Sequence, residues 1–204
     1  MALINPKKKE VQVKIVYYGP GRGGKTTNLE YINKKFKERI KGEMTTVKTY
    51  GDRTLFFDFL PVDIGKIKGY DIKVQFYTVP GQVKYNATRK LVLRGVDGIV
   101  FVADSLVVRR KMNILSLQNL NENLSSFNRR IFDVPIVLQY NKRDMEKEGI
   151  PLLSVETLEN DLNKQLKAPS FVASALTGQN VVTTMKKAIS LTVASLQKKL
   201  ELGG

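Results

Sequence analysis

Residues 19–26 combine glycines with a lysine and a threonine at a spacing that suits phosphate binding. The segment follows the pattern of Gly, four residues, Gly, Lys and Ser or Thr. Glycines are needed because consecutive backbone N–H groups must turn toward phosphate oxygens, where a Cβ would clash. Lys25 would place a positive charge at the β and γ phosphates, and the Thr26 hydroxyl would be a ligand of Mg²⁺. The segment predicts a nucleoside triphosphate site formed by Gly19, Gly21, Arg22, Gly23, Gly24, Lys25, Thr26 and Thr27.

The flanking residues predict the strand and the helix that such a loop requires. Residues 11–18 alternate and then become apolar, like a strand entering a core. Downstream, apolar residues recur at helical spacing at Leu29, Ile32, Phe36 and Ile40. A bound anion would therefore lie at a helix N-terminus. The alternative is a glycine-rich turn with a chance Lys-Thr pair, and the order of strand, loop and helix argues against it.

The rest of the chain alternates between apolar runs and amphipathic segments. Strands are expected at residues 55–60, 72–78, 99–103, 136–140 and 171–173, with a long turn from 61 to 70. Helices are expected around residues 114–127, 154–166 and 185–200. The second would be capped by Ser154, with Val155, Leu158, Leu162 and Leu166 on its inner face. Residues 42–52 are expected to form a long loop. This order predicts an α/β fold with three layers and a mostly parallel six-stranded sheet that has one antiparallel edge strand. We expect residues 1–10 to be a short basic leader and 11–200 a single domain.

The composition excludes several kinds of site. The 204 residues include no cysteine and no histidine, which excludes disulfides, thiolate ligands and imidazole bases. Catalysis must then use phosphate chemistry, carboxylates, Lys or Arg, amides or metal-bound water. The sequence has no apolar run near 20 residues and no signal-peptide pattern, so we expect a cytoplasmic protein.

The chain is strongly basic, with a formal net charge of +15. Lysines and arginines occur in many short groups along the sequence rather than in one block. The charge is typical of a solvated surface, and a patch that contacts an anionic membrane or an acidic partner is the alternative. Specific nucleic-acid binding is not expected, because no recognised nucleic-acid module accompanies the charge.

Polar segments follow the buried strands and should meet at one edge of the sheet. They are the phosphate loop and residues 78–82, 141–144 and 174–175. From Val11 to Leu200 this combination resembles a Ras-like small GTPase of the phosphate-loop class. Asn141-Lys142-Arg143-Asp144 matches the guanine-binding Asn-Lys-x-Asp of that superfamily, so Asn141, Lys142 and Asp144 are implied to bind guanine. Ser174 and Ala175 resemble the remaining base-binding loop, although a structural turn is the alternative reading.

One difference from the usual Ras-like pattern narrows the resemblance to a smaller group of these proteins. Ras-like proteins end the third strand in Asp-x-x-Gly, whereas this chain has Thr78-Val79-Pro80-Gly81-Gln82. Together with Gly-Pro-Gly at 19–21 and the segment from Asp52 to Pro61, this is similar to the bacterial MglA group of cell-polarity and gliding-motility GTPases. The resemblance implies slow hydrolysis of GTP to GDP with Mg²⁺, and a roadblock-type MglB-like activating protein. It also implies polarity or motility effectors, and recruitment to a cell pole or the inner membrane surface in the GTP-bound form.

The same resemblance suggests roles for residues in two further loops. Gln82 would position the attacking water, Gly81 would contact nucleotide, and Thr54 would sense the γ-phosphate and Mg²⁺. Arg53 would act as an arginine finger supplied in cis, the alternative being an exposed loop cation.

Two residues remain ambiguous. Because Thr78 replaces the usual aspartate, Asp58 is the carboxylate that we expect to take its place at Mg²⁺, since it alternates with apolar neighbours on its strand. Its alternative is a solvent-facing edge residue. Arg22 either touches phosphate or points to solvent, and solvent is favoured because the loop N–H groups already bind.

Two other classes of function compete with a GTPase switch. A scaffold that holds nucleotide without hydrolysing it would explain the missing aspartate. A single-turnover GTP hydrolysis assay, with and without an activating partner, would distinguish this scaffold from a GTPase switch. A basic membrane or nucleic-acid adaptor on a GTPase fold would explain the charge, and liposome or DNA binding discriminates it.

Overall fold

The computed structural model describes residues 3–5, 7–37, 44–48, 56–67, 69–82 and 85–201. The strands are β1 (Leu3–Asn5), β2 (Glu10–Tyr18), β3 (Thr45–Lys48), β4 (Phe56–Ile67), β5 (Tyr70–Thr78), β6 (Gly98–Asp104), β7 (Ile136–Asn141) and β8 (Ser170–Val172). The α-helices are α1 (Lys25–Lys35), α2 (Asn86–Leu93), α3 (Arg110–Ser125), α4 (Val155–Leu158) and α5 (Val181–Glu201). Short helices of other types are η3 (Val107–Arg109), η4 (Ile131–Asp133), η5 (Arg143–Glu148) and η6 (Glu159–Asn163).

The strands form one sheet in the order β3-β4-β5-β2-β6-β7-β8, and β1 pairs with β2. Pairing is parallel from β5 through β2, β6 and β7 to β8, and antiparallel at β3–β4, β4–β5 and β1–β2. The predicted mostly parallel α/β sheet is confirmed. Within the described residues it has eight strands rather than six. The extra strands are β1, in the expected leader, and β3, in the expected loop, and β3 rather than β4 forms the edge.

The long turn predicted between residues 61 and 70 is wrong, because β4 continues to Ile67 and β5 begins at Tyr70. Pro61 lies inside β4 although proline cannot donate a ladder hydrogen bond. The fold tolerates it because β3 pairs only with residues 56–59 of β4, which leaves the outer edge of the strand unpaired at Pro61 within the described residues. A register shift between Asp63 and Gly65 then bends the strand.

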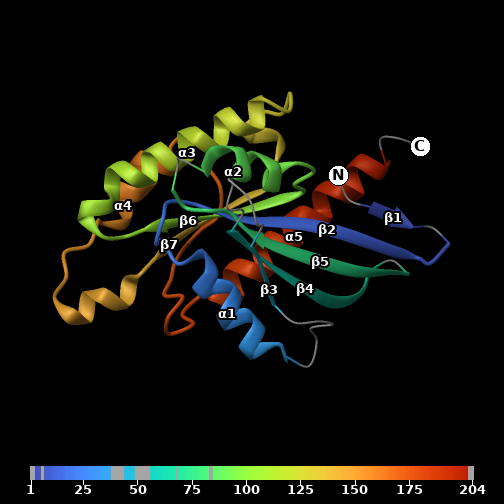
Figure 1. The fold of residues 1–204 in the computed structure, drawn as a ribbon, viewed down its shortest axis with the longest axis horizontal. Helices are drawn as coiled ribbons and strands as arrows, with labels where there is room; N and C mark the ends of the chain where they lie inside the picture. Colours follow the sequence, from blue (N-terminus) through green and yellow to red (C-terminus); the bar gives the residue numbers. More distant parts are fainter. Residues whose placement is uncertain are drawn as a thin grey trace.

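Helices cover both faces of the sheet, with α2 and α3 on one side and α1 and α5 on the other (Figure 1). Alternate residues of β2 enter the two cores, since successive side chains of a strand point to opposite faces. Val16 and Tyr18 pack with the α2 and α3 side, whereas Ile15 and Tyr17 pack with the α1 and α5 side. The strand therefore joins both cores directly before the phosphate loop.

The helical segment after residue 154 begins as predicted. The Thr157 N–H donates to Ser154 Oγ at 3.0 Å, which caps α4. Leu158 and Leu162 are buried, but Val155 is 40% exposed, so its predicted place on the inner face is wrong. The cause is its position in the first turn, where the helix has not yet reached the core.

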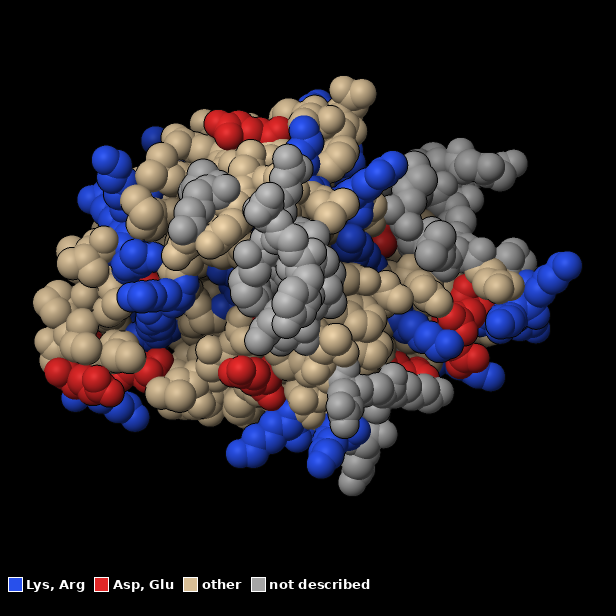
Figure 2. All heavy atoms as spheres, viewed as in Figure 1, with Lys and Arg blue, Asp and Glu red and all other residues tan. Residues whose placement is uncertain are grey.

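Basic side chains on the face shown in Figure 2 lie in several separate groups with acidic side chains between them. This arrangement is typical of a solvated surface. Across the described part of the chain, no helix is both long and apolar enough to span a membrane.

Candidate functional site

The phosphate loop connects β2 to α1 and makes two close approaches that exclude a side chain. Gly19 has a φ of +145°, and a Cβ there would lie 2.2 Å from the Val102 carbonyl oxygen. Gly24 has a φ of +95°, and its Cβ would lie 2.2 Å from Asn141 Nδ2. The glycines therefore let the loop pack against β6 and β7 while it opens toward α1.

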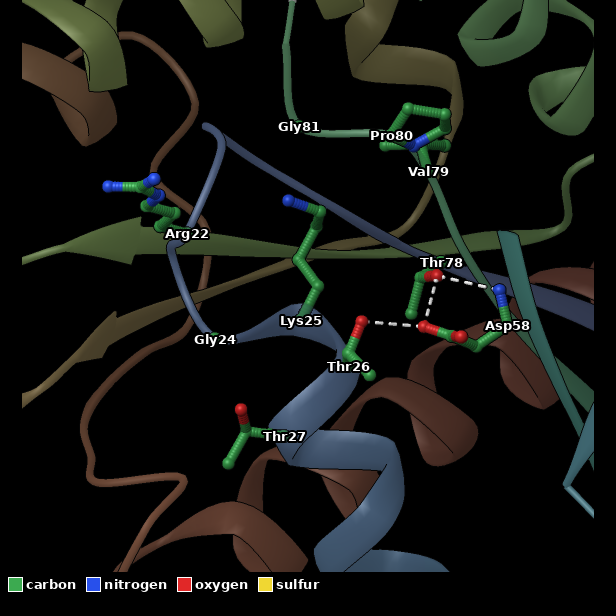
Figure 3. A pocket seen from close by; sticks show the side chains of 10 residues that line it. All are labelled: Arg22, Gly24, Lys25, Thr26, Thr27, Asp58, Thr78, Val79, Pro80 and Gly81. Atoms are coloured by element: carbon green, nitrogen blue, oxygen red, sulfur yellow. Dashed lines mark hydrogen bonds between the residues drawn. The ribbon is translucent and has the colours of Figure 1, made fainter. Parts of the chain in front are cut away.

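A cavity of about 410 Å³ lies over the N-terminus of α1 (Figure 3). It is lined by Arg22, Gly24, Lys25, Thr26, Thr27, Asp58, Thr78, Val79, Pro80 and Gly81. Backbone N–H groups and the helix N-terminus face such a space with partial positive charge, which suits an anion. The structure thus brings the predicted phosphate loop together with residues of β4 and of the segment after β5.

Lys25 lies inside the phosphate loop. Its Nζ donates to the Pro20 carbonyl at 2.7 Å and to the Gly19 carbonyl at 3.3 Å, and the residue is 6% exposed. Burial, with the nearby positive charge of Arg89, lowers the pKa of Lys25 to about 7, and Asp58 opposes this shift. A phosphate group in the cavity would give the ammonium a negative partner.

Asp58 lies in the cavity and is not solvent-facing. Its Oδ2 accepts hydrogen bonds from the Thr26 hydroxyl at 2.6 Å and from the Thr78 hydroxyl at 2.8 Å, and the residue is 6% exposed. The Asp58 N–H donates to Thr78 Oγ1 at 2.9 Å (Figure 3). The alternative reading of Asp58 as an exposed edge residue is therefore wrong, because antiparallel pairing of β4 with β5 turns it toward α1.

The 141–144 segment follows β7 and reaches the phosphate loop. Asn141 Nδ2 donates to the Gly23 carbonyl at 2.8 Å. Lys142 has a φ of +71°, and its Nζ donates to Asp104 Oδ2 at 2.7 Å. Asp144 is half-buried in η5, and its carboxylate makes no hydrogen bond or ion pair with the described residues. Both carboxylate oxygens can therefore accept from a ligand.

Ser174 and Ala175 follow β8 and lie beside the 141–144 segment. The Ala175 N–H donates to Asn141 Oδ1 at 2.8 Å, so this donor is already paired. Ser174 Oγ accepts from the Thr177 N–H at 3.1 Å and forms a turn. Asn141 consequently connects the phosphate loop and residues 174–175 through its single side chain.

The other predicted residues divide into three groups. Gly81 packs on the phosphate loop, because a Cβ on it would lie 2.2 Å from Gly21 Cα. Arg22 and Gln82 are exposed, Arg22 at the cavity and Gln82 next to Gly21. Arg53 and Thr54 lie outside the described residues.

Three charged residues that the sequence did not predict to be part of the site support it, namely Arg89, Asp104 and Arg109. Arg89 Nη2 donates to the Gly19 carbonyl at 3.1 Å, and Arg109 Nη2 donates to the Gly21 carbonyl at 2.5 Å. Arg109 Nε also lies 3.6 Å from Asp104 Oδ2, the oxygen that holds Lys142. The signal for Asp104 was its place at the carboxyl end of a buried strand. Neither arginine had a comparable signal, since both lie in helical segments.

Oxygen donors are the metal-binding groups that the cavity offers. The described residues contain no cluster of three or more carboxylate, imidazole or thiolate groups that could enclose a metal. Mg²⁺ needs few protein ligands when phosphate and water complete its octahedron. The Thr26 hydroxyl and the Asp58 carboxylate, 2.6 Å apart, fit such a partial site.

Comparisons with known proteins agree with this arrangement. The sequence model of the Ras family matches residues 14–194 of this chain. The mutual gliding-motility protein MglA of Myxococcus xanthus is 46% identical over 97% of this chain and 99% of its own length. The Ras-related protein Rab-27B of Rattus norvegicus is 24% identical over 93% of this chain and 83% of its own length. The ADP-ribosylation factor-like protein 4A of Homo sapiens is 31% identical over 71% of this chain and 64% of its own length. The chain belongs to the Ras family as an MglA-type small GTPase, which binds GTP and GDP and hydrolyses GTP.

Proposed function

We propose that this GTPase is a slow molecular switch that controls cell polarity or surface motility. The support is its similarity to the gliding-motility protein MglA over 97% of the chain. Residues 11–200 would act as one GTPase domain. In the GTP-bound form, the loops that contain Thr54 and Gln82 would be ordered around the γ-phosphate, and hydrolysis would release them. Partners would then read the difference between the two forms.

The contact of Asp58 with Thr26 carries the site assignment. Both are oxygen donors at the N-terminus of α1, next to Lys25. We infer that Thr26, Thr54 and Asp58 hold Mg²⁺, with Asp58 in the role of the aspartate that Thr78 replaces. Mg²⁺, when bound, would neutralise charge on the β and γ phosphates. Lys25 and the loop N–H groups would hold those phosphates in place.

The base would be held by the segments after β7 and β8. Asp144 has free acceptor capacity for the two N–H donors of the guanine edge, and adenine does not offer that pair. Asn141, Lys142, Ser174 and Ala175 would complete this side of the site. Their hydrogen bonds to one another and to Asp104 support a preformed base pocket.

Hydrolysis would depend on Arg53 and Gln82. Arg53 would neutralise charge on the transferring phosphoryl group, and Gln82 would orient the attacking water. We expect Arg53→Ala to lower the single-turnover rate of GTP hydrolysis by about 10³-fold or more, because arginine fingers contribute on that scale. Gln82→Leu should also block turnover, since leucine cannot position water.

The measurement is single-turnover hydrolysis with and without an MglB-like roadblock-type activating protein, together with a separate titration of GTP affinity. Arg94→Ala removes an exposed arginine at the end of α2 and serves as the matched control. Both test variants should keep GTP affinity and accumulate in the GTP-bound form. If the Arg53→Ala protein hydrolyses GTP at the parental rate, the arginine finger must be supplied by the activating protein. An Arg53→Ala protein that fails to bind GTP would make Arg53 a ground-state binding residue.

We further propose that the activating protein and motility effectors bind the GTP-bound form, and that the protein is cytoplasmic with recruitment to a cell pole. The net charge of +15 supports electrostatic contact with the inner membrane surface. Cosedimentation with anionic liposomes at low and high salt tests this contact. Binding that is equal for neutral and anionic vesicles would contradict it.

A further inference from the structure

Arg89 is the largest fully buried side chain among the described residues, and it lies against the phosphate loop. It belongs to α2, the helix that follows Gly81 and Gln82, and it is 0% exposed. Its Nη2 donates to the Gly19 carbonyl at 3.1 Å. Its guanidinium carbon lies 4.4 Å from the centre of the Tyr18 ring. Arg89 therefore contacts both ends of the junction between β2 and the phosphate loop.

The hydrogen-bond partners of Arg89 are all neutral. Nη1 donates to Asn119 Oδ1 at 2.7 Å, and Nη2 also donates to Ser116 Oγ at 2.8 Å. The buried Nε has no hydrogen-bond partner in the described structure. No carboxylate of the described residues forms an ion pair with this guanidinium. The charge is buried without a negative counterpart within that part of the chain.

Such an arrangement is costly unless another group offsets it. Removing a guanidinium from water is strongly unfavourable, and neutral hydrogen bonds and an aromatic face offset only part of that cost. Lys25 increases the cost, because its ammonium lies 3.3 Å from the Gly19 carbonyl oxygen that Arg89 also binds. The side chains of Lys25 and Arg89 thus both donate to the Gly19 carbonyl oxygen. Burial also lowers the pKa of Arg89.

We propose that Arg89 is a positioning residue for the nucleotide phosphates, whose negative charge balances its buried guanidinium while its hydrogen bond to Gly19 fixes the phosphate loop. This inference rests on the proposed nucleotide site. It assigns to α2 a contribution to affinity that grows with the number of phosphates, because the Coulomb attraction grows with the ligand's charge.

Neighbouring side chains hold Arg89 in this position. Asn119 Nδ2 and Asn123 Nδ2 donate to Asn86 Oδ1 at 3.0 and 2.8 Å, which joins α3 to the start of α2. The Tyr18 hydroxyl donates to Asn119 Oδ1 at 2.7 Å. A planar guanidinium can bind Gly19, Ser116 and Asn119 at once, whereas an ammonium cannot match that fork.

The test compares affinities for GMP, GDP and GTP in the parent protein, Arg89→Gln and Arg89→Lys. Glutamine removes the charge and keeps polar atoms, and lysine keeps the charge without the fork. For Arg89→Gln we expect little loss for GMP and a loss of about tenfold or more for GTP, with GDP between them. Arg89→Lys should retain the parent's rise in affinity with phosphate number. Arg94→Gln, at the exposed end of the same helix, should match the parent for all three ligands.

Three outcomes would overturn the proposal. An equal loss for all three nucleotides, or no loss, in Arg89→Gln would mean that the residue only supports the structure. Should Arg89→Gln fail to fold, Arg89→Lys decides alone, and loss of the dependence on phosphate number in that variant overturns the proposal. Failure of the parent to bind GDP or GTP would instead refute the proposed function, so the two failures are distinguishable.

Discussion

Among the single residues of the site, Asp58 of β4 brings its carboxylate next to Thr78, the last residue of β5. Phe59 pairs with Tyr77 across β4 and β5, which sets Asp58 beside Thr78 at the end of the sheet. The Thr78 hydroxyl and the Thr26 hydroxyl then both donate to the Asp58 carboxylate. Three oxygen-bearing side chains from α1, β4 and β5 therefore meet at this end of the sheet.

Replacing Asp58 by Asn should weaken the response to Mg²⁺. An amide keeps the size of the side chain but loses the charge that attracts the cation. We expect the Mg²⁺ concentration for half-maximal GTP hydrolysis to rise by about 10- to 100-fold, the range found when groups that orient a metal site are removed. Asp63→Asn, on the same strand outside the cavity, is the control. An unchanged Mg²⁺ requirement in Asp58→Asn would contradict a role of Asp58 at the metal site.

Replacing Asp144 by Asn should relax the preference for guanine. The amide offers one acceptor oxygen where two N–H donors of the base must be met. Loss of a hydrogen bond to a charged group costs about 1.5–3 kcal/mol, which corresponds to roughly a tenfold to hundredfold loss of GTP affinity. Competition between GTP and ATP for the protein measures the change. Glu146→Gln changes an exposed carboxylate of the same short helix, η5, and is the control. Unaltered discrimination would refute the assignment.

Among the packed elements, β6 and α5 are in such close contact that a side chain on Gly98 would clash with α5. Gly98 begins β6, and a Cβ on it would lie 2.0 Å from Thr192 Oγ1 of α5. Thr192 is itself fully buried, and its hydroxyl donates to the Ala188 carbonyl at 2.7 Å inside the helix. The missing side chain of Gly98 thus allows α5 to lie close to the centre of the sheet.

Gly98→Ala should destabilise the fold through this contact. We expect the free energy of unfolding to fall by about 1–3 kcal/mol, the usual range for overpacking a core. Thr192→Ala removes the atom in closest conflict, so the double variant should regain part of the loss. Denaturant unfolding of the parent, both single variants and the double variant gives the coupling energy. Strictly additive effects would show that the two residues do not conflict.

At the scale of the whole molecule, distant segments are joined around the phosphate loop. Arg109 connects the Gly21 carbonyl to Asp104, and Asp104 holds Lys142. Asn141 connects the Gly23 carbonyl to Ala175. These contacts join the segments that follow β2, β6, β7 and β8, and Asp58 of β4 also contacts Thr26 beside the cavity. A ligand in the cavity should therefore stabilise the whole domain.

Removing bound guanine nucleotide should therefore lower the melting temperature. A ligand at 100 times its dissociation constant stabilises the native state by about 2.7 kcal/mol, which corresponds to roughly 5–10 °C for a domain of this size. Thermal unfolding before and after treatment with EDTA and phosphatase measures the shift. Added GDP should restore the original melting temperature, and ADP should not. A melting temperature that is the same with and without nucleotide would contradict this coupling.

The elements and loops that could be predicted from the sequence depend on local interactions. The glycine spacing of residues 19–26, the apolar run of β6 and the periodicity of α1 each depend on neighbours within a few residues. Their arrangement at the carboxyl ends of the strands followed from the rules of parallel sheets, and the structure places the phosphate loop beside residues 141–144 and 174–175 as expected.

The contacts between segments far apart in the chain could not be predicted from the sequence, because they depend on how the elements pack. Arg89 is separated by 70 residues from Gly19, and Arg109 by 88 residues from Gly21. No local pattern distinguishes these arginines from solvated ones, since their burial depends on how α2 and α3 pack. The strands β1 and β3 were likewise missed, because each is short and is stabilised by its pairing with β2 or β4 rather than by its own sequence. Asp58 was ambiguous until its strand partner was known, because pairing decides which face of a strand is buried.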